Sequence, residues 1–281
     1  MRTQAATQPA VKLTPLMVRV VSGVLLLAAV VGLILLGRWG IWAIVVVLSG
    51  VALWEFRRLS DLIGFRAPSW LLFPLGAYFA FSGTVLQAIP LQLVLALALI
   101  GGLTVFLFIP GRREGLGRWA MGLAGAIYIG LPMNYYLLLY SRAGHGRGLT
   151  WLLVTIITAV VSDAGAMLVG QRLGRHPFFT SISPKKTMEG AAAGIVLCVP
   201  VMLLGGLVFL GMQPWQAVIL GLLVGVSAEA GDLVESQMKR LAGVKDSSHL
   251  IPGHGGVLDR LDSLLFPPIV VYLFAYYLHL L

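Results

Sequence analysis

The sequence predicts an all-α, polytopic integral membrane protein of about nine transmembrane helices, with a cytoplasmic N-terminus and a polar cytoplasmic active-site loop before the last helix. The first observation is composition: 58% of the 281 residues are hydrophobic and only 11% are charged, whereas a soluble domain carries about 25% charged residues. The second is the recurrence of long apolar runs, because a helix needs about 20 apolar residues to cross a bilayer.

The apolar runs define the predicted spans. Five lie in the first half, at Leu16–Leu36, Ile41–Leu59, Trp70–Leu86, Leu91–Ile109 and Trp119–Tyr140. Four follow, at Leu149–Val169, Ala191–Leu210, Pro214–Leu233 and Leu264–Leu281. The first run is interpreted as a retained membrane helix, because it is too long for a signal-peptide core and no small-residue cleavage site follows it. Gly221 and Gly225 have the small-xxx-small spacing that favours close helix packing.

The distribution of basic residues predicts the orientation. With a cytoplasmic N-terminus and nine spans, 17 of the 20 Lys and Arg residues fall on cytoplasmic segments. Only Arg38, Arg142 and Arg147 fall outside. This asymmetry follows the positive-inside rule and places the loop before the last span in the cytoplasm. It also explains the net charge of +9, so membrane lipids rather than nucleic acid are the expected partners. The single cysteine, Cys198, is expected to be a small buried residue.

Acidic residues divide the chain into two regions within one structural domain. Only Glu55, Asp61 and Glu114 precede residue 160. Residues 1–15 are predicted to be a flexible N-terminal lead, and residues 16–148 to be scaffold helices of about five spans. Residues 149–281 are predicted to be the catalytic membrane region of about four spans, with cytoplasmic loops 170–190 and 234–263. No polar linker separates the two regions.

Several carboxylates lie within or beside apolar runs. Asp163 falls inside one, where an acidic group costs roughly 2.5–3.5 kcal/mol at mid-helix, so it is expected to face a polar cavity or a partner. A structural ion pair with Lys or Arg is the alternative. Four polar residues share one helix face, namely Asp232, Glu235, Ser236 and Lys239. Asp259 and Asp262 lie three residues apart before the last span. Because carboxylates without cysteine suit a hard cation, the pattern predicts Mg²⁺.

Basic residues and glycines accompany these carboxylates. Lys185 and Lys186 precede the seventh span, and the long loop carries Lys239, Arg240, Lys245 and Arg260. The positive-inside rule alone could account for the charges, but not for their alternation with Asp, Ser and Gly. Backbone amides in Pro252–Gly256 can approach a phosphate closely, because glycine has no side chain. The sequence therefore predicts a site for a phosphorylated substrate at the cytoplasmic interface.

The polar segments resemble the signature of one family, the phosphatidate cytidylyltransferases or CDP-diacylglycerol synthases. The segment carrying the resemblance runs from Ser236 to Asp262 and ends in PGHGGVLDRLD. SDAGA at 162–166, SPKKTMEG at 183–190 and GDLVES at 231–236 are also similar to it. The family more often has Trp at the position of Met188 and Asn at that of His249. Neither difference touches a charged position. The resemblance is firm from about residue 160 onward, with Arg19 and Trp54-Glu55-Phe56 as weak echoes in the first half.

This resemblance implies transfer of CMP from CTP to phosphatidic acid, giving CDP-diacylglycerol and pyrophosphate with the help of Mg²⁺. By residue, it implies that Asp232 and Asp259 hold the metal, and that Asp262 and Asp163 support them or hold a second cation. Phosphate charge would be neutralised by Lys239, Arg240, Lys245 and Arg260. The phosphates would also meet Lys185, Lys186, His254, Gly255 and Gly256. The resemblance further suggests a homodimer in a bacterial inner membrane.

Two other classes compete with this interpretation. An ion-coupled transporter could use Asp163, Glu229 and Asp232 as an ion path, but it predicts charges spread through the membrane and repeated halves. A CDP-alcohol phosphotransferase would carry differently spaced aspartates. The sequence instead gathers its carboxylates near one face and shows no repeat, which favours the cytidylyltransferase.

Overall fold

Helices account for nearly all of the regular structure in the computed structural model, which describes residues 15–108 and 112–281. Within these ranges there is no β-strand, only two isolated bridges, Pro177–Thr187 and Ile251–Gly255. The predicted all-α fold is therefore confirmed. The flexible lead predicted for residues 1–15 lies outside the described residues except for Pro15, where α1 begins.

Each predicted span coincides with a helical segment. Six helices in the described part of the chain are long and apolar enough to cross a membrane, at Met17–Leu35, Arg38–Leu62, Glu114–Arg142, Gly146–Leu173, Met188–Leu210 and Pro214–Leu241. The other three predicted spans form shorter helices. The span expected at Trp70–Leu86 ends as helix at Phe81, and the last one is helical only over Pro267–Tyr277. The chain is thus a polytopic membrane protein, while nine crossings and their orientation remain predictions.

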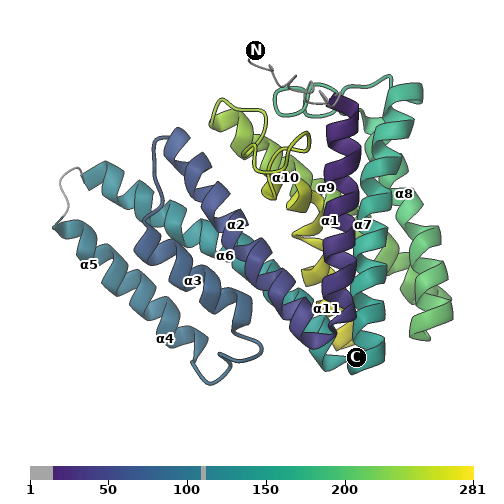
Figure 1. Cartoon of the computed structure of the whole chain (residues 1–281), viewed down its shortest axis with the longest axis horizontal. Coiled ribbons are helices and arrows are strands. Elements are labelled where there is room, and N and C mark those ends of the chain that lie inside the picture. The colour runs from purple at the N-terminus through teal and green to yellow at the C-terminus, as the bar shows by residue number, and fades with distance from the viewer. Residues whose placement is uncertain (1–14, 109–111) are drawn as a thin grey trace, which may run out of the picture.

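The N-terminal helices, apart from the first, form the left part of the view in Figure 1, and the first stands among the C-terminal helices in that view. They are α1 (Pro15–Leu35), α2 (Arg38–Leu62), α3 (Ser69–Phe81), α4 (Leu91–Ala96), the π-helical turn Leu97–Gly101, α5 (Gly102–Leu107) and α6 (Arg112–Arg142). Helix α3 packs against α6. Helix α1 packs on α2, contacts the turn at Pro252–His254 and presents most of its apolar side chains to the surroundings. Such an apolar exterior is what a lipid-facing helix requires.

The C-terminal helices form the right part of the bundle (Figure 1). They are α7 (His145–Leu173), α8 (Met188–Gly205) with a π-helical turn at Gly206–Leu210, α9 (Pro214–Leu241), α10 (Leu258–Leu261), a 3₁₀ turn at Asp262–Leu264 and α11 (Pro267–Tyr277). Helix α8 packs on both α7 and α9, which also contact each other. Cys198 on α8 is fully buried, as expected.

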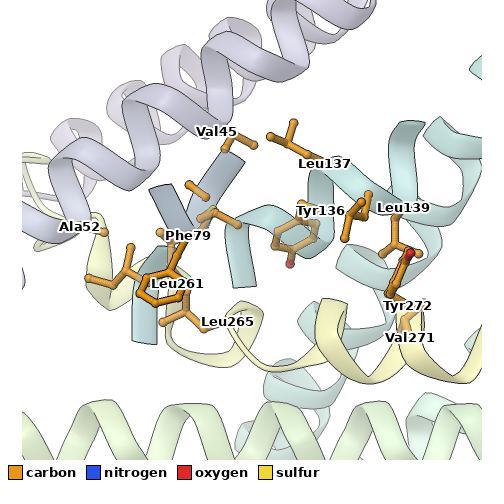
Figure 2. Close-up of a cluster of buried hydrophobic side chains, with 14 of the residues drawn as sticks. Val45, Ala52, Phe79, Tyr136, Leu137, Leu139, Leu261, Leu265, Val271 and Tyr272 are labelled. Carbon is orange, nitrogen blue, oxygen red and sulfur yellow. The ribbon is translucent and has the colours of Figure 1, made fainter. Parts of the chain in front are cut away.

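A buried apolar cluster joins the two parts of the bundle. Figure 2 shows side chains of α2, α3 and α6 meeting those of α10, α11 and the segment between them, among them Phe79, Leu261 and Leu265. Tyr136 on α6 adds a polar tie, because its hydroxyl donates to the Leu264 carbonyl at 2.8 Å. The segment that follows the long polar loop is therefore fixed against the N-terminal helices.

Close packing of α8 against α9 depends on the two glycines singled out in the sequence. A Cβ atom added to Gly225 would lie 2.7 Å from Ile195 Cα, and one added to Gly221 would lie 2.9 Å from Val199 Cα. Both neighbours are backbone atoms, which cannot move aside as a flexible side chain would. The predicted small-residue contact is confirmed, and the partner helix is α8.

We expect Gly225→Ala to lower the thermal unfolding midpoint of the detergent-solubilised protein by several degrees. The reason is overpacking against the α8 backbone, which costs about 1–3 kcal/mol. The matched control is Gly50→Ala on α2, where an added Cβ meets nothing within 4 Å. That change should leave the midpoint equal or slightly higher, because alanine is about 0.5–1 kcal/mol better than glycine inside a helix. Equal midpoints for the two variants would contradict the α8–α9 contact.

Candidate active site

The two polar loops meet at one end of the bundle, the upper end in Figure 1. Residues 174–187 join α7 to α8, and residues 242–257 join α9 to α10. Arg240 at the end of α9 ties them together, since its Nε donates to the Ile182 carbonyl at 3.0 Å and its Nη1 to the Val244 carbonyl at 3.5 Å. In this conformation the side chain of Arg240, which is predicted to be catalytic, links the two loops through hydrogen bonds to their backbone.

Lys186 lies at the centre of a buried ionic cluster. Its Nζ is 2.6 Å from Glu229 Oε2 and 2.7 Å from Asp232 Oδ2. Ser236, one turn after Asp232, donates to Asp232 Oδ1 at 3.1 Å. The lysine is held in place because Thr187 caps α8, its Oγ1 accepting from the Gly190 amide at 3.2 Å. One ammonium thus serves two carboxylates from the same helix.

Lys239 makes a second cluster of the same design. Its Nζ contacts Glu235 one turn earlier on α9 and lies 2.8 Å from Asp259 Oδ1. Asp259 Oδ2 also accepts from the Ser247 amide at 2.9 Å and the Gly256 amide at 2.8 Å. Burial alone would raise the pKa of Asp259, but the Lys239 ammonium and these amides outweigh it and hold the pKa below its usual value. Asp259 is therefore ionised and fixed to the loop.

Asp163 and Asp262 lie between the two lysine clusters. Ser263 connects them, because its hydroxyl donates to Asp163 Oδ2 at 2.6 Å and its amide to Asp262 Oδ1 at 2.7 Å. Burial raises the pKa of Asp262 to about 7, and the carboxylates of Asp232 and Asp163 add to the rise. Among the described residues Asp163 has no direct ion pair, so the structural ion pair considered as its alternative is not formed there.

Three adjacent cavities open around these residues. The first, about 420 Å³, is lined by Asp163, Asp232, Lys185 and Lys186 among others. The second, about 450 Å³, shares Asp163 with it and adds Lys239, Asp246, Asp259, Arg260 and Asp262. The third, about 640 Å³, shares Asp246 and Arg260 with the second and adds Arg19, Lys245, His249 and His254. Most of the predicted site residues therefore line a continuous series of cavities.

The backbone amides of the glycine-containing turn at Pro252–Gly256 are expected to contact phosphate. The amides of His254 and Gly255 donate to the Ile251 carbonyl at 2.9 and 3.1 Å, and the Gly256 amide donates to Asp259. These amides are satisfied internally, so they do not form an open phosphate cradle in this conformation. The Arg260 guanidinium donates to the His254 carbonyl at 2.7 and 3.1 Å and braces the same turn. The phosphate contacts expected of Gly255 and Gly256 therefore stay a prediction.

Glu55 is the functional residue that sequence reasoning missed. It lies on α2, in the region predicted to be scaffold, and its side chain is fully buried. Its carboxylate accepts from the amides of Val257 at 3.0 Å and Leu258 at 2.6 Å, and from the hydroxyls of Ser247 at 3.2 Å and Ser248 at 2.5 Å. The available signal was an acidic residue within the apolar run Ile41–Leu59. A single buried carboxylate thus anchors the middle of the loop and its C-terminal end.

Glu189 plays a comparable part in the other loop. It accepts from the amides of Arg175 at 3.0 Å and His176 at 3.2 Å, and its Oε1 lies 2.5 Å from His176 Nδ1. It lies in the first turn of α8, where an acidic side chain is favoured by the helix dipole. The short loop before α8 is therefore shaped by the helix that follows it.

The carboxylates fit a divalent cation in chemistry, although they do not form a complete coordination shell. Within the described residues, no group of three or more His, Cys, Asp or Glu side chains is arranged to hold a metal. Instead, Asp232 forms an ion pair with Lys186 and Asp259 forms one with Lys239. Glu229 Oε1 is nevertheless buried with no hydrogen-bond partner among the described residues, and Asp262 titrates near neutrality. Because Mg²⁺ needs only one or two protein carboxylates, Asp163, Asp232 and Asp262 would suffice.

Comparison with known proteins identifies the family of the chain. A family model described as the cytidylyltransferase family matches residues 17–278. The phosphatidate cytidylyltransferase of Bacillus subtilis strain 168 is 30% identical over 266 residues, covering 92% of this chain and 97% of that protein. That of Synechocystis sp. is 34% identical over 287 residues, covering 92% and 95%. A Helicobacter pylori J99 relative of the same name is 45% identical over 133 residues, covering 46% and 47%. The chain belongs to the cytidylyltransferase family.

Proposed function

We propose that this protein transfers CMP from CTP to phosphatidic acid, releasing pyrophosphate and leaving CDP-diacylglycerol in the membrane. The observation that carries the proposal is the pair of lysine-bridged carboxylate clusters flanking Asp163 and Asp262, on linked cavities at one end of a membrane bundle. One substrate is a lipid and the other is water-soluble, so the reaction needs a polar site at a membrane interface. We place this end in the cytoplasm, following the asymmetry of basic residues.

The reaction joins two anions. An ionised phosphatidate oxygen attacks the α-phosphorus of CTP, the new P–O bond forms, and the bond from that phosphorus to the β-phosphate oxygen breaks. No protein base has to remove a proton, because the attacking oxygen is already ionised at neutral pH. The protein must offset the repulsion between the phosphates and stabilise the charge that moves to pyrophosphate. Lysine and arginine side chains on the cavities supply that positive charge.

The lysine clusters are suited to binding phosphates in exchange for carboxylates. Lys186 and Lys239 each hold two carboxylates, so either ammonium can turn toward a phosphate while one carboxylate is released. Asp163, Asp232 and Asp262 would hold Mg²⁺, which when bound supplies further positive charge beside the triphosphate. Asp259 would stay with Lys239 and the loop. Lys185 and Arg260 line the same cavities and add positive charge.

The transporter alternative lacks a supporting observation. Its proposed path, Asp163, Glu229 and Asp232, lies within one cluster around Lys186 at one end of the bundle. The family and its relatives favour nucleotidyl transfer instead.

We expect Asp259→Asn to lower the rate of pyrophosphate release from CTP and dioleoyl phosphatidic acid, in the presence of Mg²⁺, by roughly a hundredfold or more. An amide does not balance the charge of Lys239. If its oxygen accepts from the Ser247 and Gly256 amides, its NH₂ group, a donor, faces the Lys239 ammonium. Asp61→Asn is the matched control, since Asp61 is exposed and pairs only with Arg66 at 3.6 Å. Thermal melting checks that the variant is folded. Full activity in folded Asp259→Asn would contradict the assignment of Asp259 to the active site. Absence of pyrophosphate release by the wild-type protein under varied lipid and metal conditions would contradict the proposed function.

Lys186→Gln tests the first cluster. It removes the ammonium shared by Glu229 and Asp232, so we expect kcat/KM for CTP to fall by roughly two orders of magnitude. Lys185→Gln, its exposed neighbour on the same cavity, should cost less than about tenfold, since surface charges contribute little. Initial rates over a range of CTP concentrations measure both. Equal losses would show that Lys186 acts only through general charge.

Glu55→Gln tests the anchor of the loop. The amide keeps the shape of the side chain but replaces one acceptor oxygen by a donor, which opposes the Leu258 or Val257 amide. An unsatisfied buried donor costs about 1–3 kcal/mol, so we expect a lower melting midpoint and a lower kcat together. Glu114→Gln is the control, because Glu114 forms only an exposed pair with Arg118 at 3.1 Å. Unchanged kcat in Glu55→Gln would show that the loop is held without this carboxylate.

A further inference from the structure

The third cavity carries positive charge that the lysine clusters do not use. Arg19, Lys245 and Arg260 line it together with His249 and His254, and Asp246 is its one carboxylate among the described lining residues. Within the described part of the chain, none of these three cations forms an ion pair. A cavity with three unpaired cations and one carboxylate attracts an anion strongly.

An apolar groove adjoins this cavity. The groove, about 540 Å³, is bounded by Val18, Val21, Ser22, Leu25 and Leu26 of α1 and by Leu250, Ile251 and Pro252 of the loop. Ile251 and Pro252 line both spaces, so the groove and the cavity adjoin at that point. Val21 and Leu25 are 48% and 64% exposed, on a helix whose apolar surface faces the surroundings. The basic cavity therefore opens along α1 onto a lipid-facing surface.

Helix α1 is seated on the loop through specific contacts. Ser22 Oγ donates to the Pro252 carbonyl at 3.0 Å and lies 3.0 Å from His254 Nδ1. Gly253 has a φ of +77°, and a Cβ there would lie 2.7 Å from Arg19 Cγ. Any other residue at 253 would push Arg19 away from the cavity wall. The position of Arg19 over the loop is thus a consequence of this glycine and of the Ser22 contacts.

We propose that the lipid substrate binds here, with its phosphate monoester in the basic cavity beside Arg19 and an acyl chain in the groove along α1. This inference rests on the proposed function. A phosphate monoester carries between one and two negative charges at neutral pH, which the three cations balance. Arg260 lines both this cavity and the second one, so the lipid phosphate would lie beside the space assigned to the triphosphate. Arg19 is then a substrate-binding residue contributed by the first helix.

The charge arm of the test compares Arg19→Gln with Arg58→Gln, an exposed arginine near the end of α2. In mixed micelles Arg19→Gln should raise KM for dioleoyl phosphatidic acid by about tenfold and leave KM for CTP within twofold. Arg58→Gln should change neither value. A rise in KM for CTP alone would overturn the proposal, because it would assign the basic cavity to the triphosphate. Unchanged KM values for both substrates would overturn it as well.

The groove arm compares Leu25→Trp with Val24→Trp. Leu25 lines the groove, whereas Val24 is its exposed neighbour on the same helix and does not. Leu25→Trp should raise KM for dioleoyl phosphatidic acid by severalfold but leave KM for a short-chain, dihexanoyl phosphatidic acid unchanged. Val24→Trp should be like wild type with both lipids. Equal effects of the two tryptophans would overturn the placement of the acyl chain.

A binding measurement separates this proposal from the proposed function. Without CTP, vesicles of phosphatidylcholine containing phosphatidic acid should raise the melting midpoint of the wild-type protein and not that of Arg19→Gln. Vesicles with phosphatidylglycerol, a phosphodiester, should raise it less, and inorganic phosphate should have little effect. Stabilisation by phosphatidic acid in a protein that releases no pyrophosphate would support the lipid site and reject the catalytic function. Equal stabilisation of wild type and Arg19→Gln would reject the site, whatever the activity.

Discussion

The buried carboxylate of Glu55 is the interaction on which the arrangement of the site depends. A carboxylate removed from water is costly unless hydrogen bonds compensate for the lost hydration, and here every donor that does so comes from residues 247–258. The dependence is mutual, since the Val257 and Leu258 amides and the Ser248 hydroxyl have no other acceptor among the described residues. Helix α2 and the polar loop can therefore reach their places only together. The N-terminal helices thus form part of the site as well as its scaffold.

Ion pairing in the site is incomplete in a way that favours exchange. Lys186 and Lys239 each bridge two carboxylates, while Asp163 and Asp262 are held by Ser263. Negative charge therefore exceeds positive charge among these buried groups, which is unfavourable in a low-dielectric interior. Cations added to the cluster, or lysines turned toward an incoming phosphate, redistribute this charge without moving a helix. Such a cluster is a suitable receptor for polyanions that bring or need a divalent cation.

Composition and local spacing predicted much of this structure. The apolar runs predicted the helices because a membrane requires each segment to satisfy its own backbone hydrogen bonds. The Asp232–Lys239 face and the Asp259–Asp262 pair were recognisable because their members are close in sequence. Contacts between distant segments were not: Glu55 is about 190 residues from Ser247, and no spacing rule links them. The phosphate contacts of Gly255 and Gly256 stay a prediction: in this conformation their amides donate to the Ile251 carbonyl and to Asp259, local bonds that the glycine pattern alone does not reveal.

Two anionic substrates that react with each other need separate sets of cations. If one set served both, the second substrate would meet a neutralised site and lose its electrostatic attraction. The structure provides two sets. Lys186 and Lys239 lie beside the carboxylates, whereas Arg19 and Lys245 line the third cavity. Arg260 lines both the second cavity and the third. Only the latter set adjoins an apolar groove. The division between a carboxylate-rich side, suited to a metal-bound triphosphate, and a carboxylate-poor side, suited to a lipid phosphate, therefore follows from where α1 meets the loop.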